Sequence, residues 1–254
     1  MLNGHSMKPF SLLVLLMALS CQVIGLAEVV DIPDPNLKAA LEKALGKNAG
    51  DAITDIELAT LTSLYARSSG ITDLTGLEYC TGLTSLDLGH NQISDISVLA
   101  NLTNLTTLWL YNNLTSDISV LANLANLTML DLNSNQISDV SPLANLTNLT
   151  FLYLNSNQIS DITPLVEHTE ISGKIYLKDN PLSNTALSTH IPALEARGIK
   201  VEYDLPEGVV LFVDNVAPVL AAVSADLALI KNGQTLTVSA TAEAGSSVSV
   251  DASA

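Results

Sequence analysis

The sequence has few cysteines and few basic residues, and both shortages exclude whole classes of protein. Its two cysteines are Cys21 and Cys80, and Cys21 lies in a segment that we expect to be removed, so a disulfide framework is excluded. Ten lysines and arginines stand against 26 acids, which gives a formal net charge of −16. So acidic a surface repels phosphate backbones and anionic lipid headgroups, and we therefore expect no nucleic acid partner.

Long apolar runs are also scarce, and the one present points to export. Residues 10–19 read FSLLVLLMAL, which is too short to cross a bilayer as a helix, and no other stretch predicts a transmembrane span. Lys8 precedes this run, and the small residues Gly25 and Ala27 follow it at the −3 and −1 positions of a cleavage site, as is typical of a secretory signal peptide over residues 1–27. By the same pattern, Met7 is a more typical start than Met1.

Two forms of export remain open. Cleavage after Ala27 predicts a secreted, extracellular or cell-surface protein. Lipidation of Cys21 is the alternative and would make the protein a lipoprotein, although the preceding Ala18-Leu19-Ser20 fits that signal poorly.

The strongest pattern is a 22-residue repeat, LxxLxLxxNxIxDIxxLxxLxx. Blocks begin at Leu61, Leu83, Leu105, Leu127 and Leu149, the fifth with one extra residue, and a shortened sixth begins at Ser172. Leucines at repeat positions 1, 4 and 6 flank and form a short strand, and apolar residues at positions 11, 14, 17 and 20 line the returning half. One repeat cannot bury these side chains alone, but stacked repeats can. The sequence therefore predicts an α/β fold, a leucine-rich-repeat solenoid (horseshoe) over residues 61–182.

Asparagine recurs at repeat position 9. An amide at the bend after each strand can satisfy backbone groups that would otherwise be buried and unpaired. We therefore predict a structural asparagine ladder formed by Asn91, Asn113, Asn135, Asn157 and Asn180. Block three departs from the pattern, because Leu114 and Thr115 stand where other blocks have Gln-Ile, which implies either a polar atom at an apolar position or a shifted turn.

The segments around the repeats have their own signals. Over residues 28–60, Asp34 as helix N-cap, Pro35 at the first helical position and Gly46 at the stop predict a helical N-terminal cap. Thr54 and Glu57 form a capping-box pattern for a second short helix.

The segments after the repeats predict a second cap and another kind of module. A helix over 185–196 and an extended stretch over 199–203 predict a C-terminal cap over residues 183–203, followed by a linker over 204–214. Residues 215–254 alternate like strands around an Asn232-Gly233 turn signal, which predicts a partial, truncated all-β immunoglobulin-like module.

Together these motifs resemble a known family. The IPDPNL cap, the NQISDISxLANLTNL repeat and the closing helix and strand, from about Val29 to Tyr203, are similar to the internalin-like leucine-rich-repeat proteins of bacteria. The resemblance implies a surface-exposed bacterial binding protein whose concave strands contact another molecule, often a protein.

Repeat positions 3, 5 and 7 point out of the core onto the predicted concave face. Six of the ten aromatic residues of the chain fall on these positions. They are Tyr65, Trp109, Tyr111, Phe151, Tyr153 and Tyr176. Because interface hot spots are enriched in Trp and Tyr, we predict a ligand-binding patch there, with Asp87 and Asp131 at its polar edge. The alternative is that these rings favour strands and pack against one another across repeats.

No arrangement of residues supports catalysis, a cofactor or a metal. The histidines His5, His90, His168 and His190 do not converge, and Cys80 falls on a core position of the repeat. We therefore predict that the protein is not an enzyme. Two hypotheses remain: a binding and adhesion module that recognises a protein, or a glycan, at a cell surface; and a structural spacer within a larger surface protein.

Overall fold

The computed structural model describes residues 27–167, 172–205, 236–239 and 249–252. The predicted signal segment up to residue 26, the insertion at 168–171 and most of the predicted linker and immunoglobulin-like module lie outside the described residues. Within the described ranges, no helix is long and apolar enough to cross a membrane.

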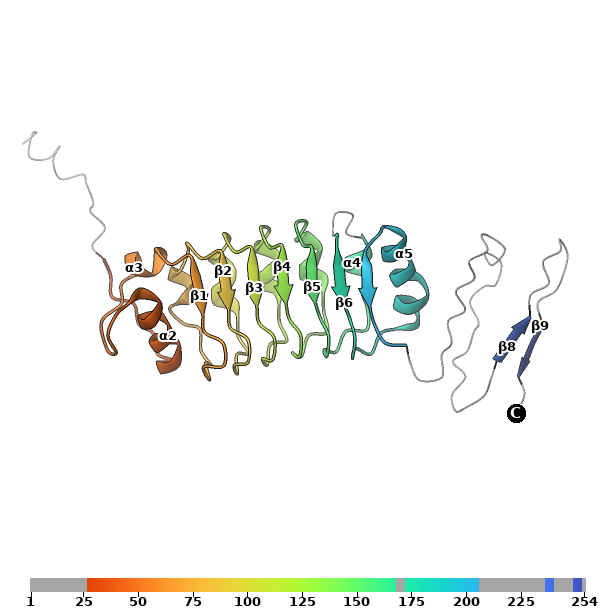
Figure 1. The fold of residues 1–254 in the computed structure, drawn as a ribbon, viewed down its shortest axis with the longest axis horizontal. Coiled ribbons are helices and arrows are strands. Elements are labelled where there is room, and N and C mark those ends of the chain that lie inside the picture. Colours follow the sequence, from red (N-terminus) through yellow and green to blue (C-terminus); the bar gives the residue numbers. More distant parts are fainter. Residues whose placement is uncertain (1–26, 168–171, 206–235, 240–248, 253–254) are drawn as a thin grey trace, which may run out of the picture.

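A seven-stranded parallel sheet runs the length of the repeats, with its strands in sequence order (Figure 1). The strands are β1 (Ser63–Tyr65), β2 (Ser85–Asp87), β3 (Thr107–Trp109), β4 (Met129–Asp131), β5 (Phe151–Tyr153), β6 (Lys174–Tyr176) and β7 (Lys200–Glu202). From β1 to β5 the register advances by one 22-residue repeat, so that Leu64, Leu86 and Leu108 lie side by side. This sheet confirms the predicted leucine-rich-repeat solenoid.

Short helical turns lie behind the sheet and connect each strand to the next. Each strand has only three residues, so most of every 22-residue repeat belongs to this connection. The turns are η1 (Leu77–Tyr79), η2 (Ser97–Asn101), η3 (Ser119–Asn123), η4 (Ser141–Asn145) and α4 (Thr163–Glu167). The repeat leucines and isoleucines bury their side chains between this layer and the sheet, and no aromatic side chain is among the buried core residues of the described chain.

Repeat three shows how its departure from the pattern is accommodated. Thr115 is fully buried at the apolar position, and its hydroxyl donates a 3.3 Å hydrogen bond to the backbone carbonyl of Ile93. Leu114 turns outward and is 48% exposed. Of the two alternatives, the structure has the polar atom at an apolar position.

The position-9 asparagines each bond to two successive repeats. In Asn135, Oδ1 accepts from the backbone N–H of Thr115 at 3.1 Å, and Nδ2 donates to the carbonyls of Leu110 and Leu132 at 3.0 and 3.1 Å. The same pattern recurs at Asn91, Asn113, Asn157 and Asn180. Each amide therefore satisfies backbone groups that the bend leaves without partners.

The residue before each of these asparagines adopts a left-handed conformation. Ser68, preceding Ser69 in the degenerate first block, does the same, and φ ranges from 53° to 56° at Ser68, His90, Asn112, Ser134, Ser156 and Asp179. Non-glycine residues adopt this region at a cost, so the asparagine bonds that follow help to hold the bend. The sequence analysis did not predict this column, because the residues at position 8 share no side-chain chemistry.

Two helices precede β1 and lie at that end of the sheet (Figure 1). Helix α2 (Pro35–Leu45) begins at Asp34, whose carboxylate accepts from the backbone N–H groups of Asn36 and Leu37, and it ends at Gly46 with φ of 68°. Helix α3 (Asp55–Ala59) begins with a capping box between Thr54 and Glu57.

The other end of the repeats carries a helix and an added strand. The π-helical turn η5 (Ala186–His190) continues into α5 (Ile191–Ala196), and β7 then pairs with β6. Further along the chain, β8 (Leu236–Ser239) pairs antiparallel with β9 (Ser249–Ala252).

Candidate binding surface

The face of the sheet opposite the returning turns is lined by repeat positions 3, 5 and 7, and we call it the open face. Strand geometry explains it, because alternate residues of each strand point to opposite sides, and the residue between positions 3 and 5 is buried in every repeat. The open face corresponds to the predicted concave face, and all eight residues of the predicted patch lie on it.

Position 5 forms a central row across the sheet. Parallel pairing places Tyr65, Asp87, Trp109, Asp131, Tyr153, Tyr176 and Glu202 next to one another in that order. Neighbouring strands are about 4.8 Å apart, so each side chain in the row is within reach of the next. Trp109 therefore has one carboxylate on each side.

Tyr111 is the centre of a cluster at the edge of this row. Its ring makes an edge-to-face contact with His90 at 5.0 Å between centroids, and the guanidinium carbon of Arg67 lies 5.3 Å from its centroid. Gly89 makes this arrangement possible, because a Cβ there would come within 2.4 Å of the Tyr111 ring. Sequence analysis missed Arg67 and Gly89 as partners of Tyr111, although both fall on position 7.

A second aromatic cluster lies on β5 and β6. The rings of Tyr153 and Tyr176 stack with 4.5 Å between centroids and 8° between planes. Phe151 remains 36% exposed, and Tyr65 at the other end of the row is 69% exposed. Packing across repeats therefore accounts for part of the predicted patch, and exposed or half-buried aromatic surface remains on either side of Trp109.

The two carboxylates beside Trp109 make only local hydrogen bonds. Asp87 Oδ1 accepts from the backbone N–H of Gly89 at 2.9 Å, and Asp131 Oδ1 accepts from that of Asn133 at 3.0 Å. Burial raises the pKa of Asp131 above its ordinary value, the Asn133 hydrogen bond opposes the shift, and the charge of Asp87 adds to it. Within the described part of the chain, no ion pair includes either carboxylate.

The open face is basic at its β7 end. Lys174 and Lys200 lie next to each other in the register of β6 and β7, and Lys178 Nζ lies 3.6 Å from a carboxylate oxygen of Glu202. Lys174 and Lys178 fall on repeat positions 3 and 7 of the sixth block, but they were not part of the predicted patch. Lys200 was not expected on this face, because residues 199–203 were predicted only as an extended stretch and not as a strand of the sheet.

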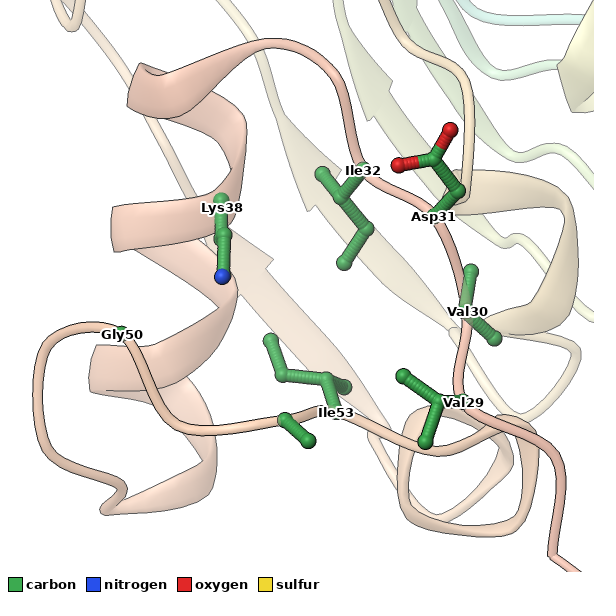
Figure 2. A pocket seen from close by; sticks show the side chains of 8 residues that line it. Val29, Val30, Asp31, Ile32, Lys38, Gly50 and Ile53 are labelled. Atoms are coloured by element: carbon green, nitrogen blue, oxygen red, sulfur yellow. The ribbon is translucent and has the colours of Figure 1, made fainter.

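A hollow of about 380 Å³ lies between α2 and the chain segments that precede and follow it. Figure 2 shows Ile32, Ile53 and Val29 around it, with Lys38 on the α2 side. Its lining is mostly aliphatic, and its charged side chains are Asp31 and Lys38. This composition provides no set of groups for catalysis.

Cys80 and His90 lie in different parts of the fold. Cys80 is buried in the core, and burial, followed by the nearby charge of Glu78, raises the pKa of its thiol to about 12. His90 lies on the edge of the open face, 3.1 Å from the amide nitrogen of Asn112. Over the described residues, no three His, Cys, Asp or Glu side chains are arranged to hold a metal ion.

The repeats that form this surface are similar to those of known proteins. The family model described as leucine-rich repeats (2 copies) matches residues 59–101, 81–123 and 125–167. The chain is similar to internalin J of Listeria monocytogenes, with 46% identity over 54 residues, which is 21% of this chain and 6% of that protein.

Two solved structures share the fold. The crystal structure of an internalin (inlF) of Listeria monocytogenes matches with a TM-score of 0.56 and 29% identity, over 72% of this chain and 59% of that one. A leucine-rich-repeat protein of Leptospira interrogans matches with a TM-score of 0.51 and 24% identity, over 59% of this chain and 38% of that one, and shows the fold alone. In each of these comparisons, including that with internalin J, the chain spans less than two thirds of the other protein.

Proposed function

We propose that this chain is an internalin-like leucine-rich-repeat protein and that it binds another protein through the open face of its sheet. The observation that supports this most is the distribution of aromatic side chains. Six of ten lie on the open face, whereas the buried core of the described chain has none. Aromatic residues that do not build the core are costly to leave in water, and they are the residues that most often dominate protein interfaces.

The proposed interface centres on Trp109. The stacked pair of Tyr153 and Tyr176 lies on one side and the Tyr111 cluster on the other. Rings held by their neighbours lose little conformational freedom when a partner docks, so less of the binding free energy is spent on ordering them. Phe151 and Tyr65 would extend the contact along the sheet.

We place this interface in an exported protein of adhesion type. The apolar run of residues 10–19, with Lys8 before it, supports a signal peptide over residues 1–27, followed by a cell-surface or secreted location. Helices α2 and α3 would cap the repeats within 28–60, and α5 with β7 would cap them within 183–203. Residues 204–214 would then link the repeats to the β-rich segment 215–254.

A spacer role within a larger surface protein is the second candidate. It is favoured by the internal packing of Tyr153 on Tyr176 and of Arg67 on Tyr111, which gives part of the aromatic surface a structural use. It predicts that changes on the open face leave every property of the protein except its stability unchanged.

A capture experiment from host or neighbouring-cell surface extracts separates the two. The full chain is compared with the variant Trp109→Ala/Tyr153→Ala and with Tyr79→Ala, which removes a 43% exposed ring from the returning layer. A partner held by the unmodified chain and by Tyr79→Ala, but lost by the folded double variant, supports binding through the open face. Equal capture by all three chains, or capture by none, favours the spacer role. Circular dichroism checks that each variant is folded.

A further inference from the structure

The arrangement around Trp109 suggests which chemical group the partner presents. Asp87, Trp109 and Asp131 occupy the same position on three adjacent strands, so one carboxylate lies on each side of the indole. Two strand spacings separate these carboxylates by about 10 Å at the level of the backbone. The indole, as the middle side chain, forms an apolar floor between two anions.

Neither of these anions forms an ion pair within the described part of the chain. Each carboxylate uses one oxygen to accept a backbone N–H of its own repeat, from Gly89 and Asn133, and the described ion pairs lie elsewhere. Asp131 is also partly desolvated, since burial raises its pKa. A neutral or anionic partner that covered this site would bury two unpaired charges at considerable cost, whereas a guanidinium would offset one of the two charges and could donate hydrogen bonds to both carboxylates.

The same face already holds a guanidinium against an aromatic ring. Arg67 reaches across Gly89 and lies over Tyr111, two repeats away from its own strand. Such stacking is typical of arginine, whose planar group combines contact with a ring and hydrogen bonds to carboxylates at its edges. Arg67 is thus occupied by Tyr111, and the Trp109 site is left for a cation from outside.

The charges of the rest of the open face restrict where a cation can dock. Lys174 and Lys200 lie side by side at the β6–β7 end and repel a basic group there. The carboxylates between β2 and β4 attract a basic group, so the charge of the open face changes from negative at β2–β4 to positive at β6–β7.

Resting on the protein-binding function proposed above, we propose that the partner docks an arginine side chain over the indole of Trp109, between the carboxylates of Asp87 and Asp131. The guanidinium lies on the ring and donates hydrogen bonds to one carboxylate on each side. The recognised feature is an exposed arginine on a partner segment narrow enough to enter the open face.

Trp109 provides its own reporter, because it is the only tryptophan of the chain. Its single indole N–H signal is followed by NMR while the full chain is titrated with acetyl-Gly-Arg-Gly-amide. The control peptide carries citrulline, which has nearly the shape of arginine without its charge. We expect a saturable shift with arginine and none with citrulline.

The variant Asp87→Asn/Asp131→Asn tests the carboxylates against a matched control. Asp95→Asn/Asp139→Asn changes the net charge equally and in the same two repeats, but at exposed turn positions. We expect affinity for the arginine peptide to fall by about tenfold or more in the first variant and to stay within about twofold in the second.

Several results would overturn the proposal. One is an equal response to arginine and citrulline, and another is an equal loss in both aspartate variants, which would indicate only the overall negative charge. A saturable shift with N-acetylglucosamine in place of the arginine peptide would assign the site to a glycan. If the captured partner needs Trp109 but binds Asp87→Asn/Asp131→Asn normally, the proposed protein-binding function is supported and the proposed arginine site is contradicted.

Discussion

Asp34 and Thr72 are joined by two hydrogen bonds across the boundary between the N-terminal helix and the first repeat. Oδ2 of Asp34 accepts from the backbone N–H of Thr72 at 2.8 Å and from its hydroxyl at 3.1 Å, and also from the N–H of Asp73. Oδ1 caps α2 through Asn36 and Leu37. One buried carboxylate therefore fixes the helix to the solenoid.

Replacing Asp34 by alanine should destabilise the protein more than loss of an ordinary helix cap. The substitution leaves backbone N–H groups of two segments without partners, and we expect a loss of about 3 kcal/mol in the free energy of unfolding. Urea denaturation followed by circular dichroism measures it. The control Asp31→Ala removes an exposed carboxylate three residues earlier and should change stability by about 0.5 kcal/mol or less. Similar losses in both variants would contradict the linking role of Asp34.

Acid should weaken the same end of the molecule. Glu57 forms an ion pair with Lys47 and accepts from Thr54, and these contacts lower its pKa from 4.5 to about 2. Because the folded pKa lies below the unfolded one, the stabilisation is complete above about pH 4.5 and is lost as the pH falls toward 2. The pKa of Asp34 is also lowered: burial opposes the shift, but backbone N–H groups, that of Thr72 foremost, outweigh it.

The Lys47→Gln variant isolates the contribution of the ion pair to this shift. We expect the pKa of Glu57, followed by carboxyl NMR, to rise toward its ordinary value, because the leading cause of its lowering is removed. Lys43→Gln changes an exposed lysine in the last turn of α2, four residues before Lys47, and should leave the titration of Glu57 unchanged. A Glu57 pKa that stays near 2 without Lys47 would assign the shift to the Thr54 capping box instead.

The asparagine ladder should be costly to interrupt in the middle of the repeats. Asn135→Ala removes the partners of the Thr115 N–H and of the Leu110 and Leu132 carbonyls, and we expect a loss of about 3 kcal/mol or more. Asn123→Ala, an exposed asparagine of the returning layer, serves as the control and should cost about 0.5 kcal/mol at most. Thermal and urea unfolding of both variants measure the difference, and equal stability would argue that water replaces the amide at the bend.

The sequence predicts those structural features that recur with the 22-residue repeat. Buried leucines, the position-9 asparagines and the residues of the open face can be read from repeat positions, because a 22-residue register places the same position in the same environment each time. The cap at Asp34 is also predictable, since local chemistry decides it. Its bonds to Thr72 and Asp73 are not, because they depend on how α2 packs against the first repeat.

Features that depend on pairs of repeats were beyond the sequence analysis. The contact of Arg67 with Tyr111 requires knowing that Gly89 leaves room between them, and the basic end of the open face requires knowing that β7 joins the sheet. Repeat position 7 did carry a signal for this contact. Gly89 occupies that position between Arg67 and Tyr111, and a glycine between two large side chains leaves room for them to meet.

Gly89 therefore offers a direct test of how the open face is built. A Cβ at this position would come within 2.4 Å of the Tyr111 ring, so Gly89→Ala must displace the ring and weaken its contacts with Arg67 and His90. We expect a loss of about 1 to 3 kcal/mol by overpacking. The same substitution in a Tyr111→Ala background should cost close to nothing, because the obstructing ring is absent. A double-mutant cycle by urea denaturation measures this coupling. Additive losses would mean that the backbone around Gly89 resists the new methyl group by itself, and the Tyr111 cluster would then not depend on a missing side chain.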